Sequence, residues 1–181
     1  SSFLRFGSWI GGDRDGHPGV TAEVTALAWR MQAVTAYEEY LHRLEGLSDQ
    51  LSLSLRLCRP SAEFMESLEE DCRQAELMFD KRPNPHPQEP YRRKLEIMRF
   101  RIRRNLMLVQ RAMDGADVSF EEQGYVSAQA FLHDLRLIRD SLIGHGDADL
   151  AHGELQDLVH LVETFGFHLL QLDIHHQSTR H

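Results

Sequence analysis

The sequence predicts a mainly helical protein with one short strand near each end. Long stretches of the chain repeat apolar residues every three to four positions, which is the spacing of a helix buried along one face. None of these stretches alternates apolar and polar residues as a half-buried strand does. Residues 3–10 and 169–174 are instead short apolar runs that are typical of buried strands. We therefore expect a single helical domain over residues 1–181, with helix in more than about half of them.

The first predicted strand leads through a Gly-Gly turn into a polar loop. Its apolar residues are Phe3, Leu4, Phe6, Trp9 and Ile10. Asp13, Arg14 and Asp15 follow at the end of this strand. An arginine between two carboxylates is held in orientation and still offers donors to an oxyanion, so these three residues are candidates for a catalytic site. A structural turn, in which the aspartates cap and the arginine bridges them, is the alternative.

A long amphipathic helix is predicted from Thr21, its N-cap, to at least Leu44. Its apolar positions repeat at helical spacing: Val24, Leu27, Ala28, Met31, Val34 and Leu41. Gly46 either ends or interrupts this helix, and residues 47–57 have no firm assignment. Arg59 and Pro60 mark a break in the chain.

Two further helices flank a proline-rich loop. Ser61 caps the first, residues 62–79, whose buried stripe contains Phe64, Leu68, Cys72, Ala75 and Phe79. The loop, residues 82–90, carries four prolines, which remove hydrogen-bond donors and fix φ. Pro90 begins the second helix, whose apolar face contains Tyr91, Leu95, Met98, Ile102, Val109 and Met113. Asp114 and Gly115 end this helix.

The last third of the chain predicts a loop, two helices and the second strand. Residues 116–125 connect to a helix that is capped by Ser127 and ended by the run Gly144-His145-Gly146. Its core face contains Phe131, Leu132, Leu135, Ile138 and Leu142. A final helix runs from residue 153 or 154 to residue 164, with Gly166 as its stop. Residues 169–174 follow as the strand that ends in polar residues.

The charge and cysteine content limit which partners and which cellular compartment the sequence predicts for this protein. The chain has 20 Lys and Arg against 28 Asp and Glu, a net charge of −8, which argues against nucleic acid or an anionic membrane as a partner. No apolar window approaches the roughly 20 residues of a bilayer span. Cys58 and Cys72 have no metal-type spacing, and without a signal-peptide pattern we interpret them as reduced thiols in a cytoplasmic protein.

The helix that begins at Pro90 is rich in basic residues: Arg92, Arg93, Lys94, Arg99, Arg101, Arg103 and Arg104. These side chains point all round a helix, and no aromatic platform lies between them, so they do not match a single-strand nucleic-acid binder. We interpret them as solvated and ion-paired surface residues, and a nucleic-acid- or phosphate-binding cluster is the alternative. Acidic neighbours are available to pair with them, such as Glu66, Glu69, Glu70 and Asp71.

No metal site is predicted in this chain. Asp13 and Asp15 are spaced as in a calcium loop, but the residues that follow lack its further acceptors and its bidentate glutamate. His175 and His176 are neighbours on a predicted strand, so they face opposite sides, and no carboxylate or third ligand is nearby. The single histidines on polar positions or loops are interpreted as inert: His42, His86, His133, His152 and His160.

Two long motifs give the chain a family resemblance. Residues 7–21, Gly-Ser-Trp-Ile-Gly-Gly-Asp-Arg-Asp-Gly-His-Pro-Gly-Val-Thr, resemble the segment G-S-W-[IM]-G-G-D-R-D-G-N-P-x-V-T of the phosphoenolpyruvate carboxylase family. Residues 165–181 resemble the same family's F-G-x-x-L-x-x-L-D-I-R-Q-x-S-x-x-H. Shorter matches fall between them in the expected order, at residues 51–54, 90–92 and 131–142.

The resemblance implies a helical segment of a distorted α/β barrel enzyme, with short barrel strands near each end. In the family, the L-D-I-R-Q strand ends at the active cavity, and its arginine helps to hold the phosphate of phosphoenolpyruvate. His175 occupies that position here, and an imidazole cannot offer the same bidentate contact. His17 likewise replaces the family's asparagine. Asp13, Arg14 and Asp15 are implied to contribute to the cavity wall.

The reaction implied by the resemblance is the carboxylation of phosphoenolpyruvate with bicarbonate to oxaloacetate and phosphate. The family's enzymes are lyases that use magnesium or manganese and form cytoplasmic homo-oligomers. Their T-x-H-P-T histidine, H-G-R-G-G loop and metal-binding acids have no match in this chain, so we expect a fragment that binds no metal and is inactive alone. The abrupt ends of the chain fit the same interpretation.

A non-catalytic homologue is the alternative, in which the helices serve as a scaffold or interaction domain and His17 and His175 mark a lost substrate site. A free-standing helical interaction module is disfavoured, because the two predicted strands have nothing in this chain to pair with.

Overall fold

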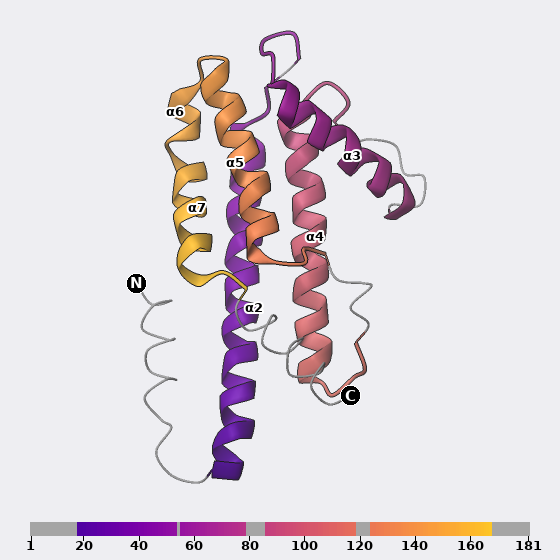
Figure 1. Cartoon of the computed structure of the whole chain (residues 1–181), viewed down its shortest axis with the longest axis vertical. Helices are drawn as coiled ribbons and strands as arrows, with labels where there is room; N and C mark the ends of the chain where they lie inside the picture. Colours follow the sequence, from indigo (N-terminus) through magenta and orange to yellow (C-terminus); the bar gives the residue numbers. More distant parts are fainter. Residues whose placement is uncertain (1–17, 54, 79–85, 119–123, 168–181) are drawn as a thin grey trace.

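The computed structural model describes residues 18–53, 55–78, 86–118 and 124–167 (Figure 1). Within these ranges the chain forms six helices and no strand: α2 (Pro18–Gln50), α3 (Ala62–Met78), α4 (Pro90–Met113), α5 (Ala128–Gly144), α6 (Ala148–Ala151) and α7 (Glu154–Phe165). The mainly helical class is therefore confirmed. The two predicted strands, residues 3–10 and 169–174, lie outside the described residues. Of the described helices, none is long and apolar enough to cross a membrane.

Local capping signals fix most helix ends where the sequence predicts them, but the predicted N-cap at Thr21 is wrong, because α2 already begins at Pro18. The Ser61 and Ser127 hydroxyls each accept a hydrogen bond from the backbone N–H three residues later, both at 3.2 Å. Pro90 is the first residue of α4. Gly115 and Gly166 have φ of 77° and 57°, in the left-handed region that glycine favours, and they follow the ends of α4 and α7. Only the short α6 has no counterpart in the sequence prediction.

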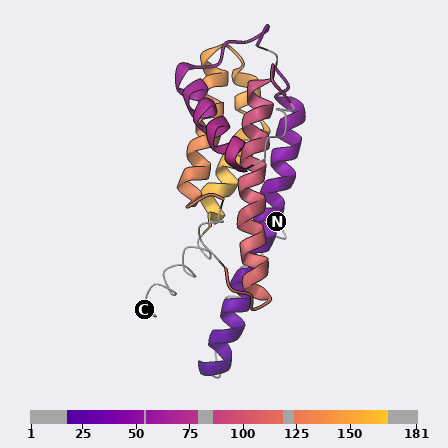
Figure 2. The same ribbon diagram turned by 90° about the vertical axis from the view of Figure 1, so that its right-hand side faces the viewer.

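The helix α2 is the axis around which the other helices gather. It packs against α4 and α7, while α5 packs on α6 and α7, and α3 contacts α4 and α5. Its 33 residues span about 50 Å at 1.5 Å per residue. In both views the N-terminal end of α2 projects beyond the other helices (Figure 1 and Figure 2).

The buried side of α2 differs from what its apolar spacing suggests. Its core side chains come mostly from its second half: Ala33, Ala36, Tyr37, Tyr40, Leu44 and Leu47. Ala28 is buried too, but Val24, Leu27 and Met31 are exposed. The helix neither ends nor breaks at Gly46, and it continues to residue 50. Apolar spacing identifies helix but cannot by itself decide which side meets a neighbour, because the neighbouring elements decide that.

An aromatic cluster joins α2, α5 and the segment that follows α7. The ring centroids of Tyr37 and Phe167 are 5.1 Å apart, and those of Tyr40 and Phe131 are 5.6 Å apart. Phe131 also stacks on Phe167 at 6.0 Å and contacts Tyr125 at 5.2 Å. Such ring pairs each contribute about 0.5–1.5 kcal/mol beyond their buried area. The cluster therefore holds the long helix against the C-terminal helices.

All four tyrosines of the chain are buried, and burial raises the pKa of each phenol: Tyr37, Tyr40, Tyr91 and Tyr125. For Tyr91 the pKa rises to about 12. A phenol whose pKa is higher in the folded than in the unfolded state contributes stability that is present below about pH 10 and is lost as the pH rises through the folded pKa.

We therefore expect the phenolate absorbance of the four tyrosines to appear in one step on alkaline titration, together with the loss of helical circular dichroism. Ionisation of any tyrosine while the helical signal stays intact would contradict this prediction.

Candidate functional site

The four residues predicted to line a substrate cavity, Asp13, Arg14, Asp15 and His175, lie outside the described residues. The structure describes the helix that follows the first three, because α2 begins at Pro18, three residues after Asp15. In the sequence, these three residues therefore stand just before the longest described helix. In the described part of the chain, polar side chains gather in two buried networks and around one surface hollow.

The first network is a buried group of four charges between α3, α4 and α5. Lys94 Nζ lies 2.5 Å from Asp71 Oδ2 and 3.0 Å from Asp134 Oδ1. Arg101 reaches the same carboxylates, with Nη2 3.0 Å from Asp71 Oδ1 and Nη1 3.5 Å from Asp134 Oδ2. The Lys94 side chain is 0% exposed, and the other three side chains are at most 11% exposed. Two positive charges thus balance two negative charges away from water.

Tyr125 completes this network from the segment before α5. Its hydroxyl donates to Asp134 Oδ2 at 2.7 Å, and the Arg101 guanidinium lies 5.5 Å from its ring centroid. Burial acts to lower the pKa of Arg101, but the negative charge of Asp71 and its neighbours outweighs this effect, so the pKa is raised above its ordinary value. Every charge in the network is paired. It therefore joins three helices and offers no free acid or base.

This network corrects the sequence interpretation of the basic helix α4. Both Lys94 and Arg101 pair with Asp71, one of the acidic partners that the sequence offered, but they are not solvated: the Lys94 side chain is buried and that of Arg101 is only 11% exposed. Arg92 and Arg99 fit the prediction of an ion-paired surface, since each pairs with a glutamate three residues earlier, at 3.5 and 3.3 Å. One sequence signal pointed to the burial of Lys94, because it stands three residues after Tyr91 on the apolar face of the helix.

The second network joins the ends of α4 and α5 to the start of α3. The Tyr91 hydroxyl lies 2.7 Å from both Ser141 Oγ and His145 Nε2, and Ser141 Oγ accepts from the Ser61 N–H at 2.8 Å. His145 Nδ1 lies 2.7 Å from Asp147 Oδ2 without the alignment of a hydrogen bond. Because burial raises the pKa of Tyr91 to about 12, its phenol stays protonated near neutral pH and is not a base. This network holds the starts of α3 and α4 against the end of α5. The sequence did not predict it.

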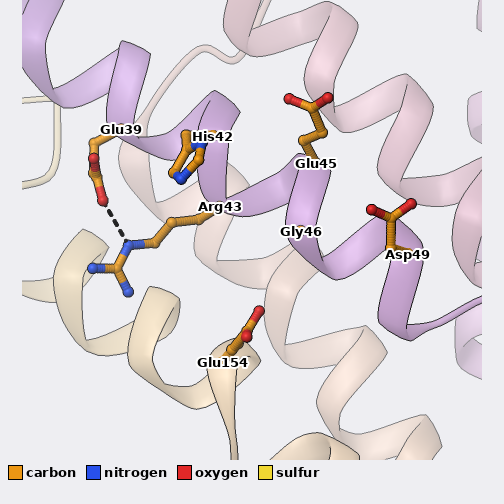
Figure 3. A pocket seen from close by; sticks show the side chains of 7 residues that line it. All are labelled: Glu39, His42, Arg43, Glu45, Gly46, Asp49 and Glu154. Atoms are coloured by element: carbon orange, nitrogen blue, oxygen red, sulfur yellow. Dashed lines mark hydrogen bonds and ion pairs between the residues drawn. The ribbon is translucent and has the colours of Figure 1, made fainter.

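A surface hollow of about 660 Å³ lies between α2 and the start of α7 (Figure 3). It is lined by Glu39, His42, Arg43, Glu45, Gly46, Asp49 and Glu154. Four of these are carboxylates, and the arginine is already paired with Glu39 at 3.0 Å. Such a lining repels phosphates and carboxylates, so the hollow is unsuited to an anionic substrate. Within the described ranges, no three His, Cys, Asp or Glu residues are grouped to hold a metal ion.

Known proteins match this chain over nearly its whole length. The family model of phosphoenolpyruvate carboxylase matches residues 1–181. The chain is 38% identical to the phosphoenolpyruvate carboxylase of Synechococcus sp. (strain WH7803) over 195 residues, which cover 100% of this chain and 19% of that protein. It is 40% identical to the phosphoenolpyruvate carboxylase of Thermosynechococcus vestitus over 186 residues, which cover 99% of this chain and 18% of that protein.

The phosphoenolpyruvate carboxylase of Roseiflexus castenholzii is similar to the same extent, with 38% identity over 180 residues that cover 98% of this chain and 19% of that protein. The chain therefore spans about a fifth of the length of these curated relatives. The matches confirm the resemblance that the two terminal motifs predict.

Proposed function

Because the chain belongs to the phosphoenolpyruvate carboxylase family, we propose that it is a helical part of an enzyme that converts phosphoenolpyruvate and bicarbonate to oxaloacetate and phosphate. The family match over residues 1–181 is the observation that carries the proposal. The relatives are about five times longer than this chain, so the chain alone is proposed to be inactive. We further propose, from the family alone, that the whole enzyme is cytoplasmic and forms homo-oligomers.

We propose that Asp13, Arg14 and Asp15 act at the substrate. The Arg14 guanidinium is always protonated and presents a planar set of donors that matches a phosphate or a carboxylate. The flanking carboxylates can hold its orientation. His175 replaces a guanidinium in the family pattern and contributes less, because a neutral imidazole has a single N–H donor.

In the proposed reaction, a bicarbonate oxygen attacks the phosphorus of phosphoenolpyruvate, and the enolate oxygen leaves as carboxyphosphate forms. The enolate carbon then forms a bond to the carboxyl carbon, which releases phosphate. Negative charge builds on the enolate oxygen, so a fixed guanidinium nearby lowers the barrier. The family implies a magnesium or manganese ion, but the described residues offer no fitting ligand group, and we assign this ion no residue of the chain.

Arg14→Ala in the full-length enzyme is expected to lower kcat/KM roughly a hundredfold, because losing a charge-assisted contact to the substrate costs about 2–3 kcal/mol. His175→Ala is expected to cost less than about tenfold. Steady-state oxaloacetate formation measures both, with thermal denaturation of each variant in parallel. Near-normal turnover of the Arg14→Ala enzyme would overturn the assignment, and a matching fall in stability would show that Arg14 only pins its loop.

The substitution His175→Arg provides the control for the altered family position. It restores the guanidinium, so activity should stay unchanged or rise. Loss of all activity in this variant would contradict the proposed cavity wall. A full-length protein that shows no turnover in its natural form would instead support the non-catalytic scaffold.

A further inference from the structure

The first half of α2 carries an exposed apolar face. Val24, Leu27 and Met31 are 56%, 48% and 43% exposed. A helix turns by about 100° per residue, so Met31 lies about 160° around α2 from Ala33, which belongs to the core face. The three residues thus lie away from the core face, and the neighbouring helices leave them uncovered.

The same side of α2 becomes polar in its second half. Continuing from Met31 at helical spacing, the positions are Glu38, His42, Glu45 and Asp49, and all four are exposed. A solvated helix face is polar in this way. The apolar residues are therefore confined to the half of α2 whose end projects beyond the other helices (Figure 2).

We propose that the α2 apolar face, defined as Val24, Leu27 and Met31, is a docking surface for the rest of the carboxylase polypeptide. The chain spans 19% of its relative's length, so about four-fifths of such a protein lies outside it. The three side chains are uncharged, so the surface that covers them is apolar as well. This proposal rests on family membership and not on the proposed reaction.

Docking at this face has a consequence for the candidate catalytic residues. Asp13, Arg14 and Asp15 precede α2 in the sequence, and Asp15 stands three residues before Pro18, the first residue of the projecting end of the helix. A contact that fixes this end of the helix also fixes the position of Pro18, from which the chain connects to these three residues. We therefore propose that the apolar face also acts as a positioning surface for the N-terminal end of α2.

A second copy of this chain is the rival occupant of the face. A standard interface between two stable partners uses about 20–30 residues a side. The α2 apolar face offers only three large apolar side chains, each about half exposed. That is too little for a dimer built on this face alone, but it suits one part of a larger contact within a single polypeptide.

Cysteine labelling of the full-length enzyme tests the proposal. Leu27→Cys places a thiol on the apolar face, and Glu38→Cys places one on the polar continuation of the same side as a matched control. Labelling is read by peptide mass spectrometry, so Cys58 and Cys72 do not interfere. Relative to the urea-unfolded protein, the thiol at position 27 should react at least about tenfold more slowly, because a covered thiol needs local opening. The thiol at position 38 should react almost as fast as in the unfolded protein.

The outcomes separate the occupants of the face. Equal, fast labelling at positions 27 and 38 would overturn the proposal, as would equal protection at both. If protection at position 27 disappears on dilution, the face binds a second copy of the protein, and the proposal is overturned as well. Met31→Cys repeats the test if the first variant does not fold. Since labelling needs no turnover, a failure here is distinct from a failure of the proposed reaction.

Discussion

Replacing Lys94 with methionine is expected to lower the free energy of unfolding by about 3–5 kcal/mol. Methionine keeps much of the apolar length of the side chain but removes the ammonium group that lies 2.5 Å from Asp71 and 3.0 Å from Asp134. Arg101 alone then faces two carboxylates that are each only 8% exposed. One buried negative charge is left without a counterion. Urea denaturation followed by helical circular dichroism measures the loss.

Arg73→Met is the matched control for this variant. Arg73 also forms an ion pair, at 2.5 Å from Glu70, but both side chains are more than half exposed. Exposed ion pairs contribute little to stability because water screens them, so the control should lose much less stability than Lys94→Met. The double variant Lys94→Met with Asp134→Asn removes one charge of each sign and should be more stable than Lys94→Met alone. Equal small losses for Lys94→Met and Arg73→Met would show that the buried network does not stabilise the fold.

Gly124→Ala is expected to cost about 3 kcal/mol or more, or to prevent folding. A Cβ atom at position 124 would lie 1.8 Å from the backbone oxygen of Arg101 and 2.5 Å from Asn105 Oδ1. The segment is held at this distance because Asn105 accepts from the Tyr125 N–H at 2.8 Å and donates to the Tyr125 carbonyl at 3.0 Å. An added methyl group therefore forces the segment off α4 and breaks both hydrogen bonds.

Gly144→Ala is the matched control for the loss of a glycine. Gly144 is the last residue of α5, and nothing lies within 4 Å of a Cβ atom there. Alanine is favoured over glycine inside a helix by up to about 1 kcal/mol, so this variant should be as stable as the parent chain or slightly more stable. Urea denaturation of the two variants side by side is the measurement. If Gly124→Ala proves as stable as Gly144→Ala, the close approach of this segment to α4 is wrong.

Helix ends were predictable because their signals act within a few residues. Pro90 starts α4 because its missing N–H and fixed φ suit the first turn of a helix. Gly115 follows the end of α4 with φ of 77°, which costs glycine little. Ser127 caps α5 through a hydrogen bond to a residue three positions away. None of these interactions depends on the rest of the fold.

In the candidate site, too, features carried by consecutive residues could be predicted, and contacts between distant residues could not. The motif around Arg14 is long enough to indicate a family, and the match over residues 1–181 confirms that family. The roles of Arg14 and His175 stay predictions. The contacts of Tyr91 with Ser141 and His145 could not be predicted, because these residues are 50 and 54 positions from it and meet only when α4 and α5 pack.

The sequence by itself determined the longer helices, the caps at Ser61 and Ser127 and the family, because local backbone preferences and long motifs are written in consecutive residues. Tertiary structure alone decided which side of α2 is buried, since that helix has apolar residues on opposite sides and the elements packed on it, among them α4, α7 and Phe131 of α5, select between them. It also decided whether the Lys94 side chain is buried or exposed to water. A lysine on an apolar helix face can extend to water or stay buried, and here Asp71 and Asp134 on two other helices keep its charge inside.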